Sequence, residues 1–425
     1  MNELLYLTHR IPYPPNKGDK IRSFNILKHL AGHYRVHLGT FVDDPDDWRH
    51  VAELKRYCAD VCVRPLSPKL AKLRSLSGLV TKKPLTLPYY RDRVLADWVD
   101  GVLAGGVDRA LVFSSAMAQY LPTDAGGLHT VIDLVDVDSE KWRQYAQRHR
   151  FPMSWVYRRE GERLLDFERG LAMHGAGLVL VTQEEAGLFK RLAPEAADRV
   201  HAVENGVDAE YFSPDHAFDS PYSQHEAPVV FTGAMDYWAN VDAVEWFARE
   251  MFPAVRARVP EAVFVIVGAR PAPAVQRLDR LPGVRVTGSV HDVRPYLAHA
   301  RVSVAPLRVA RGVQNKVLEA MAMAVPVVAT PEALDGLRWE RGAGVIAEQD
   351  PQAFAQRVAG ILADDSGLRR SQAAAARQWV CTHYDWRSKM QGFSDLLELR
   401  TPRLRPEISG TAEAVATAVP SESHG

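Results

Sequence analysis

The residues best suited to chemistry lie in one segment of the C-terminal half, Pro306 to Ala322. At the 100° per residue of an α-helix, Gly312, Lys316 and Glu319 fall on one stripe, with Asn315 beside it. A separate apolar face holds Val313, Val317, Ala320, Met321 and Ala324. The pattern predicts an amphipathic helix whose polar stripe faces outward.

The start of this helix has the properties of an anion site. Arg308 and Arg311 precede the helix, and Lys316 lies in its first turn. Free backbone N–H groups and the helix dipole favour negative charge at the same place, so we expect a pyrophosphate to bind there. Glu319, one turn further, is placed to accept hydrogen bonds from ribose hydroxyls. On spacing alone, the alternative is a set of solvated charges on a helix surface.

Apolar runs that alternate with helix-like stretches position this segment. In the first half we expect strands at 4–8, 36–42, 110–114, 130–135 and 177–181, with helices at 21–30 and 157–170. In the second half we expect strands at 229–232, 263–267, 284–287, 302–305 and 325–329, with helices at 241–259, 313–324 and 351–364. Such alternation predicts parallel sheets covered on both faces. The predicted fold class is α/β, with two Rossmann-like domains.

The 425 residues are enough for two domains of ordinary size. We place the first domain at 1–205 and the second at 206–385, with the boundary at a turn signal near Asn205-Gly206. A helix at 386–400 is expected to pack back toward the first domain. Residues 401–425 are rich in Ala, Thr, Ser and Pro and are expected to form a disordered tail.

Several motifs carry a resemblance to a known family. Gly312 to Ala322, continued to Thr330, resembles the donor-site signature of retaining family-4 glycosyltransferases of the GT-B fold. Further segments similar to landmarks of that family are Asn205-Gly206-Val207-Asp208, Phe231-Thr232-Gly233, Val265 to Gly268 and Val286 to Val290. More narrowly, Asp133 to Ser139 and Gly312 to Ala322 resemble the sugar transferases associated with PEP-CTERM/exosortase loci.

The resemblance implies a metal-independent enzyme without a cofactor, in cell-surface or exopolysaccharide biosynthesis. It would transfer a sugar, with retention, from a nucleotide diphospho-sugar co-substrate to a saccharide or polyprenyl-linked acceptor. We assign catalytic roles to Lys316, Glu319 and Asp136. The N-terminal domain is expected to bind the acceptor and the C-terminal domain the donor. The expected donor-binding residues are Gly18, Gly233, Met235, Gly268, Val290, Arg308, Arg311, Gly312, Gln314, Asn315, Lys316 and Glu319.

The acceptor cleft is expected to contain Asp19, Asp138 and Ser139. Asp136 and Asp138 have the spacing of a metal–diphosphate motif, but they lie far in sequence from the predicted donor helix. We therefore interpret Asp136 as a base or as an acceptor-orienting residue; a structural loop aspartate is the alternative. Gly18 follows the first strand, where a glycine lets the backbone approach a ligand, unless it serves only a tight turn.

Two departures from the family pattern bear on activity. Arg311 stands where the family commonly has the first of two glutamates, which leaves Glu319 as the second. The loop Ala234 to Asn240 lacks the arginine and lysine that the family usually has there. We expect Arg308, Arg311 and Lys316 to supply the positive charge instead. An inactive homologue and a nucleotide-sugar epimerase of similar architecture remain alternatives.

Composition limits the partners and the compartment. Lysine plus arginine equals aspartate plus glutamate, 52 against 52, so no overall field draws the molecule to nucleic acid. Three cysteines in a long chain indicate a reducing compartment. The apolar run Leu4 to Leu7 is too short for a signal peptide, and no run approaches the ~18 residues that cross a bilayer. We expect a cytoplasmic protein.

Residues 64–93 are locally basic, with eight basic residues against one acidic residue, Asp92. Leucines and the pair Tyr89-Tyr90 are interleaved with these charges. We interpret the segment as a contact to the anionic inner face of the cytoplasmic membrane. A solvated pair of helices is the alternative.

Overall fold

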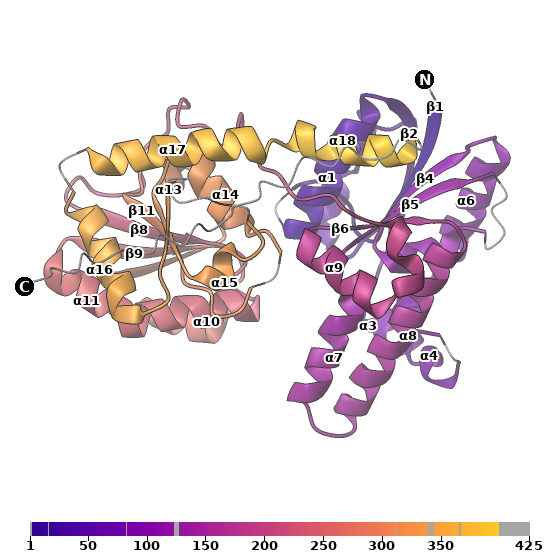
Figure 1. Ribbon diagram of the computed structural model, residues 1–425, viewed down its shortest axis with the longest axis horizontal. Helices are drawn as coiled ribbons and strands as arrows, with labels where there is room; N and C mark the ends of the chain where they lie inside the picture. Colours follow the sequence, from indigo (N-terminus) through magenta and orange to yellow (C-terminus); the bar gives the residue numbers. More distant parts are fainter. Residues whose placement is uncertain are drawn as a thin grey trace, which may run out of the picture.

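Two parallel sheets form the framework of the molecule (Figure 1). The computed structural model describes residues 2–15, 17–81, 83–122, 127–310, 312–337, 339, 344–364 and 367–398. Within them, the first sheet has the strand order β3-β2-β1-β4-β5-β6-β7 and the second the order β10-β9-β8-β11-β12-β13. All adjacent strands are parallel. The expected α/β class with two Rossmann-like units is confirmed.

The first unit, here the N-terminal domain, has β1 at its centre. Leu5 of β1 pairs with His37 of β2 and with Ala110 of β4, and Leu4 to Leu7 are fully buried, as a strand covered on both faces requires. The strands are β1 (Asn2–Thr8), β2 (Tyr34–Val42), β3 (Asp60–Pro65), β4 (Arg109–Phe113), β5 (His129–Val135), β6 (Gly177–Leu180) and β7 (Val200–Ala202). The helices are α1 (Gly18–Ala31), α2 (Val51–Leu54), α3 (Pro68–Ser75), α4 (Ser77–Val80), α5 (Thr86–Tyr89), α6 (Arg93–Ala104), α7 (Asp138–Arg148), α8 (Met153–Met173) and α9 (Gln183–Leu192).

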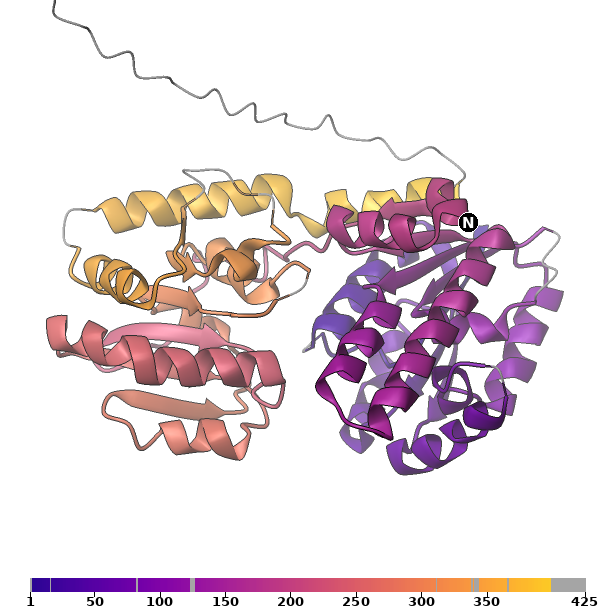
Figure 2. The same cartoon turned by 60° about the horizontal axis from the view of Figure 1, so that its bottom comes forward.

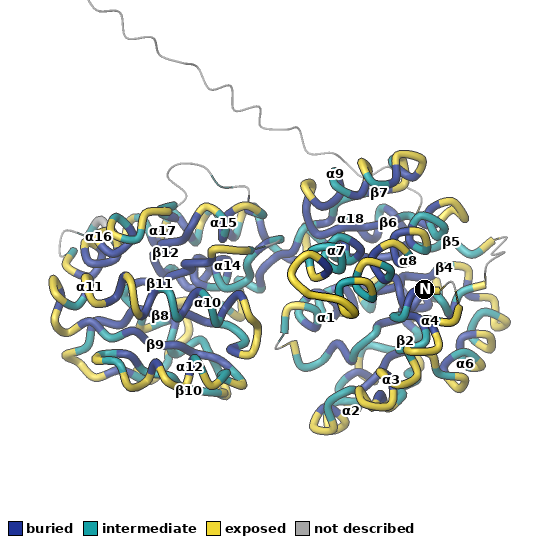
Figure 3. The backbone as a smooth tube through the Cα atoms, turned by 90° about the horizontal axis from the view of Figure 1, so that it is seen from below, coloured by how far each residue is buried: buried dark blue, intermediate teal, exposed yellow. Residues whose placement is uncertain are grey.

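The second unit, the C-terminal domain, repeats the arrangement. The strands are β8 (Ala227–Thr232), β9 (Ala262–Val267), β10 (Val284–Gly288), β11 (Val302–Ala305), β12 (Val327–Ala329) and β13 (Val345–Ala347). The helices are α10 (Trp238–Trp246), α11 (Phe252–Arg258), α12 (Pro273–Leu278), α13 (Arg294–Ala298), α14 (Asn315–Ala322), α15 (Pro331–Leu334), α16 (Pro351–Leu362) and α17 (Leu368–His383). In both domains the central strands are buried between helices, as the dark blue segments of Figure 3 show. None of the described helices is long and apolar enough to cross a bilayer.

The last described helix, α18 (Trp386–Leu397), belongs spatially to the N-terminal domain. α17 runs along the C-terminal domain, and α18 continues across to the other domain (Figure 2). The stripe Trp386, Met390, Phe393 and Leu397 is buried in the core that contains β1, β2 and α1. The expected helix that crosses back is confirmed. Residues 399–400 at its predicted end and the predicted tail 401–425 lie outside the described residues.

The structure differs locally from the expected elements. The helix predicted at 313–324 begins at Asn315, because the backbone at Gln314 is extended, with φ −84° and ψ 101°. It ends at Ala322, and Ala324 has a φ of +53°. The helix predicted at 241–259 starts at Trp238 and contains a π-helical turn, Phe247–Met251. The antiparallel helices α7 and α8, which pack side by side and project from the N-terminal domain, were only partly expected (Figure 1).

A buried arginine joins four parts of the chain. Arg22 of α1 donates from Nε and Nη2 to the two carboxylate oxygens of Asp133 in β5, at 2.7 and 3.1 Å. Its Nη1 donates to Asn205 Oδ1 at 2.9 Å, and its guanidinium lies 5.4 Å from the ring centroid of Phe393 in α18. Arg22 is 1% exposed and Asp133 is fully buried, so each charge depends on the other for compensation.

The chain passes between the domains twice at one place. Val207 N donates to Tyr384 O at 2.7 Å, and Val207 pairs with Asp385 in an isolated parallel bridge. Gly206 lies so close to the second crossing that a Cβ there would be 2.6 Å from Tyr384 O and 2.9 Å from Trp386 N. A side chain at position 206 would therefore separate the two crossings.

We predict that Arg22→Met destabilises the protein by about 3–5 kcal/mol, because it leaves the Asp133 carboxylate buried and unpaired. The matched control is Arg35→Met on β2, whose side chain is 60% exposed and whose loss should cost less than about 1 kcal/mol. Urea unfolding followed by circular dichroism measures both. Equal midpoints for the two variants would show that the buried pair does not hold the domain together.

Candidate functional site

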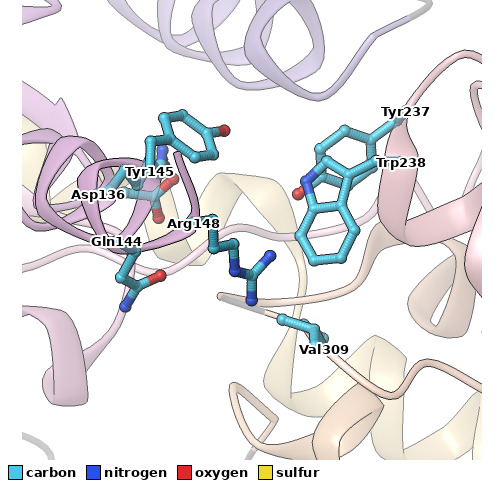
Figure 4. Close-up of a pocket in the computed structure, with 9 residues that line it drawn as sticks. Asp136, Gln144, Tyr145, Arg148, Tyr237, Trp238 and Val309 are labelled. Atoms are coloured by element: carbon cyan, nitrogen blue, oxygen red, sulfur yellow. Dashed lines mark hydrogen bonds and ion pairs between the residues drawn. The ribbon is translucent and has the colours of Figure 1, made fainter. Parts of the chain in front are cut away.

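Loops that follow strands of both sheets meet between the domains. A Cβ on Gly312, after β11, would lie 3.7 Å from Asp136 Oδ1 and 3.2 Å from Val181 Cγ1, which follow β5 and β6. A pocket at this meeting point is lined by Asp136, Lys141, Gln144, Tyr145, Arg148, Tyr237, Trp238, Val309 and Ala310 (Figure 4). Ligands of open parallel sheets bind outside the carboxyl ends of the strands, where the strand order reverses. In the second sheet that point lies between β8 and β11.

Lys316 spans this reversal point. It lies in the first turn of α14, after β11, but its Nζ donates to Asn240 Oδ1 at 2.6 Å, in the first turn of α10 after β8. Asn240 Nδ2 in turn donates to Ala234 O at 2.9 Å. The ammonium also lies 4.7 Å from the ring centroid of Phe231. Buried residues anchor α14 in the C-terminal domain: Val317, Leu318, Ala320, Met321 and Ala322.

Glu319 shares the environment of Lys316, one helical turn away. Burial raises the pKa of the Glu319 carboxyl to about 7, although Lys316 opposes the shift. Burial lowers the pKa of the Lys316 ammonium to about 8, although Glu319 opposes it. Both groups are therefore ionised together only in a narrow range around neutral pH. An anion bound beside Lys316 would favour its protonated form.

Glycines let the loops around this helix approach closely. A Cβ on Gly268 would lie 1.7 Å from Gly233 O, so no side chain fits between the ends of β8 and β9. Gly312 has a φ of +62°, and a Cβ on Gly336 would lie 2.4 Å from its carbonyl carbon. Met235 is fully buried, and its backbone N donates to Ala269 O at 2.9 Å. These residues shape the backbone of the site.

The other expected donor-binding residues differ in their partners and in their burial. Arg308 donates to both oxygens of Asp242, with Nε at 2.9 Å, and lies 5.2 Å from the Trp246 ring centroid, so its charge is already compensated on α10. Gln314 Nε2 donates to Gly312 O at 3.3 Å. Asn315 Oδ1 is buried without a hydrogen-bond partner in the described part of the chain. Val290 packs against the C-terminal core, and Arg311 lies outside the described residues.

On the N-terminal side, the loop before α1 carries the positive charge of Lys17, which immediately precedes Gly18. Burial, together with Arg10 and with Arg270 of the other domain, lowers the pKa of Lys17, although Asp43 opposes the shift. Asp19 is already engaged: Arg10 Nη1 donates to it at 2.6 Å. Burial alone would raise the pKa of Asp19, but His9 and Arg10 hold it below its ordinary value. Asp19 therefore contributes to the positioning of Arg10.

Asp136 is presented by an irregular strand end. The pairing of β5 with β6 shifts between Asp133 and Val135, and Val135 has a φ of +68°, which is strained for a β-branched residue. Lys141 Nζ then donates to Asp136 Oδ2 at 2.8 Å and to Asp138 Oδ1 at 2.9 Å. Burial alone would lower the pKa of Lys141, but Asp138 and Asp136 raise it above its ordinary value. An ammonium thus lies between the two carboxylates.

Ser139 was expected in the acceptor cleft, but its side chain is buried away from it. It is fully buried in the first turn of α7, where its carbonyl oxygen would lie 2.7 Å from a Cβ on Gly161 of α8. Its hydroxyl has no hydrogen-bond partner among the described residues. The close packing of α7 on α8 turns this residue inward. Among the described residues, no group of three or more His, Cys, Asp or Glu side chains is arranged to hold a metal.

Several site residues were not predicted. Lys141 could have been found, since it lies three and five residues after the two aspartates. Asn240 lies in a loop already singled out, but only the fold brings it to Lys316. Arg148 and Trp238 are in different domains, with the guanidinium 5.3 Å from the indole ring, so no sequence spacing signals their contact.

Residues 226–364, most of the C-terminal domain, match the family described as Glycosyl transferases group 1. No curated protein sequence matches the chain. Sucrose-phosphate synthase from Thermosynechococcus elongatus is similar in structure, with a TM-score of 0.65, 17% identity, and coverage of 94% of this chain and 99% of that one. HepE from Anabaena, in complex with UDP and glucose, gives a TM-score of 0.64, 16% identity, and coverage of 94% and 100%. WaaG, a glycosyltransferase involved in lipopolysaccharide biosynthesis, gives 0.61, 17%, and coverage of 93% and 99%.

At these identities the structural likeness shows the fold, and it extends over nearly the whole chain. Together with the match over residues 226–364, it supports a glycosyltransferase. The chain has the two-domain GT-B fold, and its C-terminal domain matches Glycosyl transferases group 1.

Proposed function

We propose that this protein transfers a sugar from a nucleotide diphospho-sugar to a hydroxyl of a saccharide or lipid-linked saccharide acceptor. The observation that carries the proposal is the position of Lys316, which reaches from α14 to the first turn of α10 at the reversal point of the second sheet. In the resembled family, the loop before α10 usually holds the basic residues that bind the donor phosphates. Lys316 brings a charge to the same place from another element. The likeness to HepE in complex with UDP-glucose adds support.

In the proposed reaction the C-terminal domain, residues 206–385, binds the donor, and the N-terminal domain, residues 1–205, binds the acceptor. Lys316 and the N-terminal amides of α14 stabilise the charge that develops on the departing nucleotide diphosphate. Lys17 and the backbone at Gly18 face the same anion from the other domain. Glu319 accepts hydrogen bonds from the ribose hydroxyls. Arg308 is left out of this scheme because Asp242 already compensates its charge.

Asp136 is proposed to orient the acceptor hydroxyl and to accept its proton as the new glycosidic bond forms and the bond to the diphosphate breaks. We propose a reaction without a metal or a cofactor; the support is Lys141, whose ammonium lies between Asp136 and Asp138, where a divalent ion would otherwise bind. Retention of the anomeric configuration and a role in cell-surface or exopolysaccharide synthesis rest on the family resemblance. Product analysis by NMR and assays with a chelator check configuration and metal use.

We predict that Lys316→Met and Glu319→Gln each lower turnover roughly a hundredfold or more, because each removes a group that stabilises the bound diphosphate or nucleoside. The donor is first identified by a thermal-shift panel of nucleotide sugars that begins with UDP-glucose, since a bound ligand raises the unfolding temperature. Released nucleotide and labelled product are then measured. Unchanged turnover in both variants would remove this site from the mechanism.

The matched control is Arg308→Gln, which removes a positive charge from the segment between β11 and α14 and should change turnover less than threefold. Incubation of the donor alone distinguishes the alternatives. A new sugar epimer without acceptor would indicate an epimerase, and donor binding without any transfer would indicate an inactive homologue.

The paired ionisation of the site predicts a pH dependence of donor binding. Affinity for UDP-glucose, whose diphosphate keeps its charge in this range, should fall as the pH rises through about 8, where Lys316 loses its proton. It should also fall as the pH drops through about 7, where Glu319 becomes protonated. Lys316→Arg should remove the alkaline decrease, because arginine stays charged. An alkaline decrease that persists in this variant would assign it to another group. Isothermal titration calorimetry from pH 6 to pH 9.5 measures both.

We further propose a cytoplasmic protein that docks on the inner face of the membrane through a surface on the N-terminal domain. Exposed apolar residues of α3 and α4 supply it: Leu70 at 69% exposure, Leu73 at 67% and Val80 at 93%, flanked by Lys69 and Lys72. Within 64–93, Arg64 is paired with Asp92, whereas Lys69 and Lys72 of α3 are exposed.

The hairpin of α7 and α8 extends this surface. Arg159 of α8 donates to Gly78 O at 2.6 Å and to Thr81 O at 2.5 Å, which fixes α4 against α8. Trp155 lies one turn nearer the hairpin end on the same side of α8, and it is exposed. Phe151, at the hairpin end, is 81% exposed. Exposed aromatic and basic residues together are typical of a membrane interface.

We predict that Lys69→Gln/Lys72→Gln weakens binding to phosphatidylglycerol-containing vesicles more than tenfold, because each basic residue near an anionic membrane contributes about 1 kcal/mol. Cosedimentation measures the bound fraction. The control, Arg277→Gln/Arg280→Gln, removes the same charge from exposed positions in the C-terminal domain and should not change binding. No binding of the unmodified protein, or equal loss in both variants, would contradict the docking surface.

A further inference from the structure

The pocket between the domains has two different walls. One wall is the face of α7 that carries Gln144, Tyr145 and Arg148, and the other is the indole of Trp238 at the start of α10 (Figure 4). Asp136 lies at the N-terminal end of the α7 wall, beside the loop that contains Gly312. The pocket therefore includes the residue proposed to orient the acceptor hydroxyl.

Arg148 differs from the neighbouring cations in its partners. Two other cations that the structure describes nearby are compensated, since Lys141 bonds Asp136 and Asp138, and Arg308 bonds Asp242. Arg148 is exposed and has no ion-pair partner among the described residues; its guanidinium instead lies 5.3 Å from the Trp238 ring centroid. A planar guanidinium in this state is suited to bind a carboxylate or phosphate through two parallel hydrogen bonds.

Trp238 supplies the complementary surface. An indole face presents a large, rigid apolar area to a ligand, and the C–H groups on one face of a pyranose ring match it. Asp136, Arg148 and Trp238 line the same pocket, so a sugar ring on Trp238 could present a charged substituent to Arg148 and a hydroxyl to Asp136.

We infer that this pocket binds the terminal sugar of the acceptor and selects one that carries an anionic group, a ring carboxylate or a phosphate. Trp238 stacks on its ring and Arg148 binds its anion. The inference rests on the proposed function and adds the acceptor class to it.

The experiment measures sugar binding by saturation-transfer NMR with three probes: methyl β-glucuronide, methyl β-glucoside and glucose 6-phosphate. Saturating UDP-glucose, whose binding is measured first, keeps the phosphate probe out of the donor site. We expect the glucuronide or the phosphate to bind roughly tenfold more tightly than the neutral glucoside, because a hydrogen bond to a charged group is worth more than a neutral one. The tighter of the two identifies the source of the anionic group.

Arg148→Gln should abolish this preference, and Trp238→Ala should weaken all three probes. The matched control, Arg150→Gln, loses the same charge two residues along the chain, outside the pocket lining, and should keep the preference. Equal affinity for charged and neutral probes, including no measurable binding of any, overturns the inference. So does a preference that survives Arg148→Gln, or an equal loss of UDP-glucose affinity in that variant, which would place Arg148 in the donor site. If UDP-glucose does not bind the unmodified protein, the proposal of UDP-glucose as donor fails. The three sugar probes are then compared in the absence of UDP-glucose, and their relative affinities still decide this inference.

Discussion

The geometry of the whole molecule depends on one buried charge pair, Arg22 with Asp133. Taking both charges out of water is costly, and the cost is offset only while the two parallel hydrogen bonds between them persist. Arg22 also donates to Asn205 and packs on Phe393. The same guanidinium therefore contacts the start of the interdomain segment and helix α18. Asp133 is three residues before Asp136 in the strand that presents it. The pair therefore connects the framework to the cleft.

The cleft itself is organised by the pairing of cations. Arg10, Lys141 and Arg308 each have a carboxylate partner, which turns them into rigid supports for the loops that carry them. Lys316 is held by the neutral amide of Asn240 instead, although the Glu319 carboxylate one turn away also acts on its charge. A count of basic residues does not distinguish cations that are paired with carboxylates from a cation that is held by an amide. Burial lowers the pKa of Lys316 to about 8.

The sequence predicted what depends on local pattern. Continuous apolar runs such as Val229 to Thr232 are typical of strands covered on both faces, and the spacing of Lys316 and Glu319 within an amphipathic stretch indicated the polar stripe of α14. What could not be predicted depends on contacts between residues that are far apart in the chain. Arg308 precedes the helix as an anion-binding residue would, yet Asp242, 66 residues earlier, takes its charge. Ser139 follows two cleft aspartates, yet the packing of α7 on α8 buries it.

The two crossings between the domains have a consequence for ligand entry. The chain leaves the N-terminal domain near Val207 and returns to it near Tyr384 and Asp385, and backbone hydrogen bonds join these two segments. Both covalent connections between the domains therefore lie at the same place. Any change in the angle between the domains must bend the two segments together at that place. Such a change in angle would separate the loops that carry Gly312 and Asp136, which lie close together in this structure.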